Sequence, residues 1–178
     1  MRVITGSARG MALRTLEGND VRPTTDKVKE ALFSAIQFEI EGRRILDLFA
    51  GSGQLGIEAL SRGAESAVFV DADKNAVKIV KENLAKTKLD FKATVAQTDS
   101  IAFITMTDRI FDIAFLDPPY ETGLLQKALS KISDNIAEGG MVICEHPFKE
   151  ELAEEYGGLR KSKEYKYSKV AVTVYRKS

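Results

Sequence analysis

Short apolar runs alternate with amphipathic segments from about residue 43 onward, and this alternation constrains the fold more than any other feature of the chain. Apolar runs of strand length indicate buried strands, whereas apolar residues three or four positions apart indicate helices. Regular alternation of the two indicates βαβ units, and therefore a mostly parallel sheet with helices on both faces. The expected strands are 44–49, 66–70, 91–96, 112–116 and 141–145, and the expected helices are 55–62, 74–86, 100–105 and 123–136.

The C-terminal part of the chain changes character. Residues 159–167 and 169–176 read as two strands with alternating side chains. We expect them to form an antiparallel edge of a seven-stranded sheet. The pair Gly139-Gly140 is expected to end the preceding helix, because glycine commonly terminates helices.

The N-terminal part also lies outside the alternating pattern. Residues 2–5 and 11–16 are expected to pair as a small hairpin. A helix is expected over 27–38, with Thr24 or Thr25 as its N-cap.

The chain has 178 residues, enough for one domain with a full core. We expect a single domain made of the hairpin extension (1–22) and a Rossmann-like α/β core (23–178). Hydrophobic residues make up 44% and charged residues 29%, as in soluble globular proteins. No apolar run has the length of a membrane span, and the first residues lack the apolar core of a signal peptide, so we expect a cytoplasmic protein. Nothing in the sequence demands a partner chain, and we expect a monomer.

Cys144 and His146 are the only cysteine and the only histidine of the chain. No internal disulfide can form, and one residue of each kind cannot make a Cys/His zinc site, so we expect no bound metal. Cys144 lies in an apolar run and is interpreted as a small buried hydrophobe. His146 is interpreted as a hydrogen-bonded residue at a strand end rather than as a catalyst.

The net charge of zero conceals an asymmetry along the chain. Residues 1–22 carry a net charge of +2, residues 23–156 carry −8 and residues 157–178 carry +6. Basic ends on an acidic body fit two interpretations, a solvated surface and a surface that contacts the phosphates of a polyanion. The candidate substrate-binding residues are Arg2, Arg9, Arg14, Arg22, Thr24 and Lys166.

The tetrapeptide Asp117-Pro118-Pro119-Tyr120 follows the expected strand 112–116. Two consecutive prolines cannot continue a strand or enter a helix interior, so the chain turns there. The turn places a carboxylate, a carbonyl and an aromatic ring at the carboxyl end of a strand, where open α/β sheets bind ligands. The two acceptors suit the hydrogens of an exocyclic amine, and the ring can stack on the base that carries the amine. The structural alternative is a plain turn with a buried tyrosine.

A glycine-rich segment follows the first expected strand. Gly51, Gly53 and Gly56 satisfy G-x-G-x-x-G, and Asp71 lies 20 residues after Gly51. This spacing permits a dinucleotide, with Asp71 on a ribose hydroxyl. Asp47 precedes the glycines, and a carboxylate there disfavours a pyrophosphate but suits an ammonium group. S-adenosylmethionine, which has an ammonium group, a ribose diol and no phosphate, fits these residues better.

Asp99 follows the third expected strand and has two interpretations. It can accept a hydrogen bond from an adenine N6 amine, or it can cap the helix 100–105. The expected cofactor-binding residues are Asp47, Phe49, Gly51, Ser52, Gly53, Asp71, Ala72, Thr98 and Asp99.

Four segments carry a family resemblance: 2–6 (RVITG), 22–33 (RPTTDKVKEALF), 47–53 (DLFAGSG) and 117–120 (DPPY). Together they resemble the RsmD-type class I methyltransferases, which methylate the N2 amine of guanine 966 in 16S ribosomal RNA. The resemblance covers nearly the whole chain. The second segment is the most specific, because the last two are shared by many amino-methyltransferases.

The resemblance implies a Rossmann-like class I methyltransferase fold, with S-adenosylmethionine as cofactor. It also implies small-subunit ribosomal RNA, or its assembling particle, as partner. In this family pattern Asp117 and Tyr120 hold the target amine, and the Pro118 carbonyl can accept its second hydrogen. The resemblance also implies that the cofactor is bound by Asp47, Gly51, Gly53 and Asp71.

Three other interpretations remain open at this point. The first is an adenine N6 methyltransferase of RNA or DNA, because the Asp-Pro-Pro-Tyr turn serves either amine. The second is a nucleic-acid-binding module without catalysis, which the intact Asp47, Asp71 and Asp117 disfavour. The third is a nicotinamide-dependent oxidoreductase. Without the family resemblance, Arg22 and Thr24 also fit an ordinary turn and helix cap.

Overall fold

The computed structural model describes residues 1–16 and 25–178. Its strands are β1 (Arg44–Asp47), β2 (Ser66–Asp71), β3 (Ala93–Gln97), β4 (Phe111–Leu116), β5 (Ile136–Pro147), β6 (Glu155–Tyr156), β7 (Leu159–Tyr167) and β8 (Val170–Lys177). Its α-helices are α1 (Thr25–Ala35), α2 (Gln54–Ser61), α3 (Lys74–Thr87), α4 (Ser100–Met106) and α5 (Leu124–Ile132). Two short 3-10 helices, η1 (Asp90–Lys92) and η2 (Ser133–Asn135), complete the set. None of these helices has both the length and the apolar character needed to cross a membrane.

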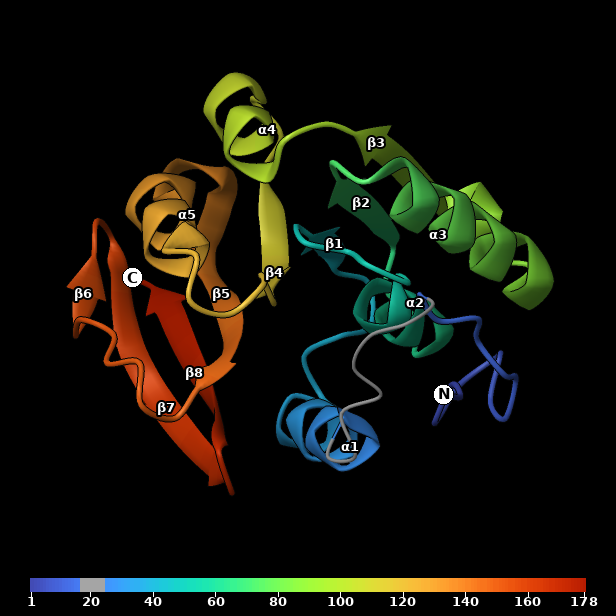
Figure 1. The fold of residues 1–178 in the computed structure, drawn as a ribbon, viewed down its shortest axis with the longest axis horizontal. Helices are drawn as coiled ribbons and strands as arrows, with labels where there is room; N and C mark the ends of the chain where they lie inside the picture. Colours follow the sequence, from blue (N-terminus) through green and yellow to red (C-terminus); the bar gives the residue numbers. More distant parts are fainter. Residues whose placement is uncertain (17–24) are drawn as a thin grey trace.

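The described strands form one sheet in the order β3-β2-β1-β4-β5-β8-β7-β6 (Figure 1). The strands from β3 to β5 in this order are parallel to one another, and β8, β7 and β6 extend the sheet with antiparallel pairs. The predicted parallel sheet with an antiparallel C-terminal edge is therefore confirmed. The predicted number of seven strands is wrong by one, because the two-residue β6 is too short to show any periodicity in the sequence.

Helices cover both faces of the sheet, as the alternation predicts. One core packs α1, α2 and α3 against alternate residues of the strands, among them Ile45, Phe69 and Phe115. The second core packs α4 and α5 against the intervening residues, such as Leu46 and Leu116. Each central strand is apolar on both faces because it is buried on both faces.

The prediction that Gly139-Gly140 ends a helix is wrong. Helix α5 ends at Ile132, and η2 leads directly into β5. Gly139 has a φ of +77°, and a Cβ on Gly140 would lie 2.8 Å from the carbonyl oxygen of Asp112. The register of β4 and β5 shifts beside this pair, so the two glycines mark an irregularity within a strand.

The first 16 residues, hereafter the N-terminal arm, form a hairpin-like loop rather than the predicted pair of strands. A single antiparallel bridge joins Arg2 to Ala12, and the Val3 N–H donates to the Met11 carbonyl over 3.0 Å. Side chains of the core hold the arm: Asn83 of α3 binds both the N–H and the carbonyl of Arg14, at 2.8 and 2.9 Å.

Glu58 of α2 is one anchor of the arm and is completely buried. Its carboxylate accepts hydrogen bonds from the N–H groups of Ile4 (2.8 Å) and Thr5 (3.0 Å). It also pairs with the buried ammonium of Lys29 on α1 (3.2 Å) and with Arg62 (2.9 Å). Burial lowers the pKa of Lys29, and the charge of Glu58 opposes that effect. One carboxylate thus joins the arm, α1 and α2.

Candidate active site

Acidic residues stand at, near or just after the carboxyl ends of the five parallel strands. Because parallel strands end at the same edge, this places the five carboxyl-bearing residues along one side of the sheet. In sheet order they are Asp99, Asp71, Asp47, Asp117 and Glu145. Strands β1 and β4 are neighbours in the sheet although β2 and β3 lie between them in the sequence. Their ends therefore flank the switch point at which open α/β sheets bind ligands.

Asp47, at the end of β1, is almost completely buried. Its Oδ2 accepts a hydrogen bond from the N–H of Gly56 over 3.0 Å. Burial raises the pKa of the Asp47 carboxyl to about 7; the Gly56 N–H opposes the rise, and the nearby charge of Asp71 adds to it. A buried carboxyl with a raised pKa gains most from a cationic partner.

The glycine-rich loop is fixed against the next strand by Asp71. The carboxylate of Asp71 accepts from the N–H of Gly51 and from the N–H of Asp73, both at 2.9 Å. Gly51 and Gly53 have φ angles of +57° and +82°, a region that side chains with a Cβ rarely adopt. The conformation of the loop next to Asp47 therefore requires these two glycines.

The other predicted cofactor residues surround this loop. Phe49 packs partly against the second core, and the Ser52 carbonyl accepts from the Asn83 amide at 2.9 Å. Ala72 is exposed after β2, and Thr98 is half-buried after β3.

Asp99 serves as an N-cap in this structure. It is exposed at the start of α4, and its Oδ2 accepts from the N–H of Ala102 over 2.9 Å. This contact supports the capping interpretation, and the adenine interpretation stays a prediction.

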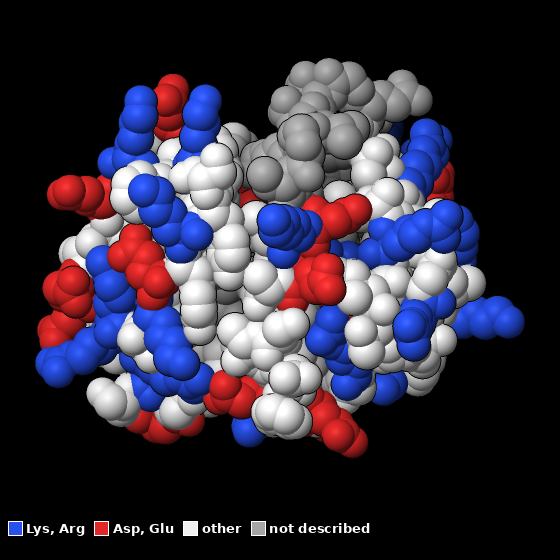
Figure 2. All heavy atoms as spheres, turned by 90° about the horizontal axis from the view of Figure 1, so that it is seen from below, with Lys and Arg blue, Asp and Glu red and all other residues white. Residues whose placement is uncertain are grey.

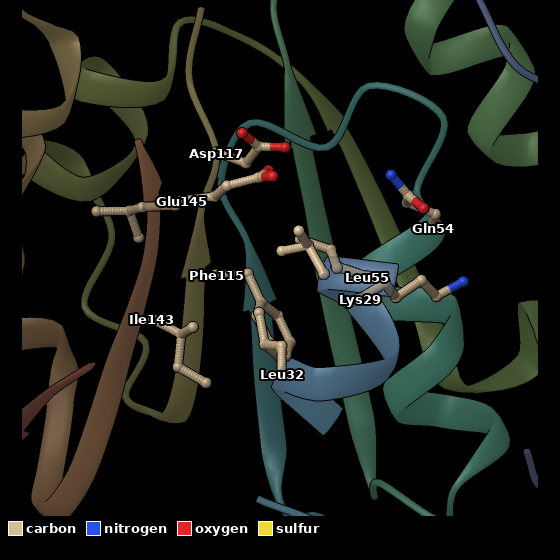
Figure 3. Close-up of a pocket in the computed structure, with 10 residues that line it drawn as sticks. Lys29, Leu32, Gln54, Leu55, Phe115, Asp117, Ile143 and Glu145 are labelled. Atoms are coloured by element: carbon tan, nitrogen blue, oxygen red, sulfur yellow. The ribbon is translucent and has the colours of Figure 1, made fainter. Parts of the chain in front are cut away.

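The Asp-Pro-Pro-Tyr turn leaves β4 beside a pocket (Figure 3). Asp117 lines this pocket, Pro118 is buried and Tyr120 is half-buried. The wall is largely apolar and comes from α1, α2, β4 and β5. The lining residues are Val28, Lys29, Leu32, Gln54, Leu55, Phe115, Leu116, Asp117, Ile143 and Glu145.

The predicted substrate-binding residues do not gather in one place. The arm carries Arg2, whose Nη1 donates to the Gly10 carbonyl (2.8 Å), and Arg14, which pairs with Glu82 (2.5 Å). Arg9 is exposed on the same arm, whereas Lys166 lies over the ring of Phe148, 3.8 Å from its centroid. Arg22 and Thr24 lie outside the described residues. Figure 2 shows the side on which β4 and β5 end: basic side chains lie on both flanks, mixed with acidic ones on the left, and several acidic side chains lie near the middle.

Cys144 and His146 have the structural roles expected of them. Cys144 is fully buried, and burial raises the pKa of its thiol. His146 is buried at the end of β5, with Nε2 2.8 Å from the Thr173 hydroxyl and Nδ1 2.9 Å from the Pro147 carbonyl. The carbonyl can only accept, so Nδ1 is the donor of that hydrogen bond.

Sequence reasoning missed Glu145 and Gln54 as polar residues of the pocket. Glu145 is the last residue of the expected strand 141–145, and this position was the available signal; the observed β5 continues to Pro147. Gln54 begins α2, and its Oε1 is buried with no hydrogen-bond partner among the described residues. No sequence pattern distinguishes Gln54 from a surface residue of an amphipathic helix.

The parallel sheet, its helices on both faces and the site at its switch point define a Rossmann-like class I methyltransferase fold. Residues 1–176 match the family model described as "Conserved hypothetical protein 95". The chain belongs to this family, that of the RsmD-type methyltransferases.

Named relatives agree with this assignment. The chain is 42% identical over 182 residues to YlbH of Bacillus subtilis (strain 168), which is named as an rRNA methyltransferase; the match covers 99% of each chain. It is 35% identical over 147 residues to ribosomal RNA small subunit methyltransferase D of Escherichia coli (strain K12), covering 82% of this chain and 74% of the relative. The solved structure of yhhF from Escherichia coli superposes with a TM-score of 0.88 at 31% identity, covering 100% of this chain and 98% of that one.

Proposed function

We propose that this methyltransferase transfers a methyl group from S-adenosylmethionine to the N2 amine of a guanine in small-subunit ribosomal RNA. The single observation that carries the proposal is the placement of the Asp117 turn beside the Asp47 loop, across the switch point of the sheet. The names of the relatives support an rRNA substrate, and position 966 is the first to examine. We also propose that the chain acts as a single-domain monomer in the cytoplasm.

The residues at the strand ends suit S-adenosylmethionine better than a dinucleotide. A buried carboxyl with a raised pKa, as in Asp47, favours an ammonium group and opposes a pyrophosphate. Asp71 and Asp99 add two further acceptors for ribose hydroxyls and an adenine amine. When bound, the cofactor supplies an electrophilic methyl group.

The turn after β4 would orient the nucleophile. A guanine N2 lone pair is delocalised into the ring and is a poor nucleophile, so its direction matters. If Asp117 and the Pro118 carbonyl accept the two amine hydrogens, the lone pair is held toward the methyl donor, while Tyr120 stacks on the base. Positioning of this kind can supply roughly 7–11 kcal/mol of the barrier in favourable cases. The base must first leave its stack, at a cost of about a few kcal/mol. The amine proton can leave after transfer, so no strong base is needed.

The direct test is transfer of labelled methyl to unmodified small-subunit RNA, to small-subunit particles and to DNA, followed by digestion to nucleosides and mass analysis. Label in N2-methylguanosine establishes the proposal and identifies the accepted substrate. Label in N6-methyladenine replaces the substrate and keeps the chemistry. Bound cofactor without any transfer would favour a non-catalytic binding module.

Cofactor affinity should depend on pH in a bell-shaped manner. In the free protein the pKa of Asp47 is about 7, so below that value a proton must leave before the carboxylate can hold an ammonium group. Affinity should then fall by up to about tenfold for each pH unit below 7. Above about 8 the cofactor's own α-amino group loses its charge, and affinity falls again. Calorimetric titration with S-adenosylhomocysteine between pH 5.5 and 9 measures both limbs.

The matched variant is Asp47→Asn, which keeps the hydrogen bond from Gly56 and removes the charge. Asp47→Asn should strongly weaken the binding of S-adenosylhomocysteine and abolish the fall in affinity below pH 7, the acidic limb of the curve. Since the pKa of Asp47 is raised on folding, the wild-type native state binds more protons than the unfolded state between about pH 4 and 7. Its stability therefore decreases as pH rises through that window, and Asp47→Asn should remove the decrease. An acidic limb that survives in Asp47→Asn would assign it to another group.

RNA binding should weaken with salt, and removal of basic residues at the ends should reduce that dependence. Arg9, Lys166 and Lys169 are exposed on the two basic flanks. For the triple alanine variant, the slope of log affinity against log salt should become shallower by about 0.7–0.9 for each phosphate that the variant no longer neutralises. Lys131→Gln in the last turn of α5 is the control. A slope equal to that of the wild type would remove the two flanks from the RNA interface.

A further inference from the structure

Glu145 of β5 lies beside Asp117, the residue that follows the neighbouring strand β4. Leu116 of β4 pairs with Cys144 of β5. Asp117 directly follows Leu116, and Glu145 directly follows Cys144. Both line the same pocket. Figure 3 shows their carboxylates side by side above Phe115. The pocket therefore presents two adjacent groups that accept hydrogen bonds.

The rest of the pocket suits a planar ring with polar atoms at its rim. Leu32, Leu55, Phe115 and Ile143 form apolar walls. The buried Oε1 of Gln54 adds an acceptor without a hydrogen-bond partner among the described residues, across the pocket from the carboxylates. An acceptor left unsatisfied in this way favours a ligand that donates.

Lys29, the one lysine among the described residues that line the pocket, is directed elsewhere. The ammonium of Lys29 lies 3.2 Å from Glu58 and 3.2 Å from the Arg2 carbonyl. Figure 3 shows its side chain extending away from Asp117 and Glu145. Lys29 therefore does not offer a donor between the two carboxylates.

This arrangement discriminates between bases. The Watson–Crick edge of guanine carries two donors side by side, the N1–H and the N2 amine. In adenine and cytosine a ring nitrogen that only accepts stands next to the amine. A second carboxylate beside the one that holds the amine attracts the guanine edge and repels the other two.

Building on the proposed function, we propose that Glu145 is the residue that selects guanine, by accepting the N1–H of the base whose N2 amine Asp117 holds. Asp117 alone serves any exocyclic amine, whereas Asp117 and Glu145 together require adjacent donors. The proposal concerns specificity, and the methyl transfer itself does not need Glu145 to exchange a proton.

The test uses small-subunit RNA ligated from fragments, with guanine or 2-aminopurine at the position that the enzyme modifies. 2-Aminopurine keeps the amine at C2 but has an accepting N1. The wild type should prefer guanine by at least about 10²-fold in kcat/KM, since a site that binds a donor rejects an analogue without it. In Glu145→Gln the amide can donate to N1, and the preference should fall by at least about tenfold. Glu138→Gln, the same change at the other end of β5, should leave the preference unchanged.

Two further readouts separate the possible failures. Glu145→Asp keeps the carboxylate and should keep the preference at a lower rate, so the proposal stays testable if Glu145→Gln does not fold. A wild type that methylates guanine, with the same preference in Glu145→Gln, overturns the role of Glu145 and leaves the proposed function intact. A wild type that transfers nothing to guanine overturns both.

Discussion

Replacing Asp117 by alanine should reduce methyl transfer by about 10³-fold or more. The variant lacks the acceptor that fixes the amine, and misplacing a nucleophile or removing one preorganised hydrogen bond costs about 10²–10³-fold each. Asp117→Asn should retain more activity, because the amide oxygen still accepts one hydrogen. Single-turnover transfer of labelled methyl to small-subunit RNA or particles measures both variants.

Cofactor binding provides the control for this experiment. Asp47 and Asp71 belong to β1 and β2, whereas Asp117 belongs to the turn after β4 and is expected to contact the substrate amine rather than the cofactor. The dissociation constant for S-adenosylhomocysteine should therefore change by less than about threefold in Asp117→Ala. Loss of binding together with transfer would indicate misfolding or a cofactor role for Asp117, contrary to the role proposed here.

The largest effect on stability is expected at Glu58. Replacing Glu58 by alanine leaves the Lys29 ammonium buried without its counterion and leaves the N–H groups of Ile4 and Thr5 unpaired. Breaking a buried pair in this way typically costs about 3–5 kcal/mol of unfolding free energy. The matched control is Glu82→Ala, which removes an exposed partner of Arg14 and should cost less than about 1 kcal/mol. Urea unfolding monitored by circular dichroism measures both.

The pH dependence of Glu58→Gln distinguishes a charge effect from impaired packing. Burial lowers the pKa of Lys29, and the charge of Glu58 and its hydrogen bond are the largest contributions that oppose this effect. Glu58→Gln removes that charge. The native state then binds fewer protons than the unfolded state up to about pH 10, so stability should rise with pH over that range. The double variant Lys29→Met/Glu58→Gln should recover much of the stability. A deficit that is constant with pH, with no recovery in the double variant, would attribute the effect to packing.

Residues that act through local pattern could be predicted from the sequence. The alternation of strands and helices located Asp47, Asp71, Asp99 and Asp117 at strand ends, and the sheet order confirms that they share one edge. Their roles toward cofactor and substrate stay predictions. Gly139 shows the limit of such patterns, because a glycine pair has the same signature at the end of a helix and in an irregular strand.

Residues that act through distant contacts could not be predicted. Glu58 and Asn83 look like ordinary polar positions of amphipathic helices, and only the folded chain shows that both are buried against the N-terminal arm. Glu145 lies near the end of β5, a strand whose neighbour in the sheet was not known from the sequence. Its relation to Asp117 depends on the pairing of β4 with β5, which no local spacing encodes.

The anchoring of the N-terminal arm sets the order of events while the chain is being synthesised. Ile4 binds a side chain 54 positions later, and Arg14 binds one 69 positions later. At about 5–20 residues per second, the arm leaves the ribosome roughly 3–14 seconds before its partners do. Val3 and Leu13, which are buried in the finished protein, remain uncovered during that interval. The segment that is translated first is therefore among the last to reach its folded position, and a nascent chain that stalls before α3 is complete would present it to chaperones.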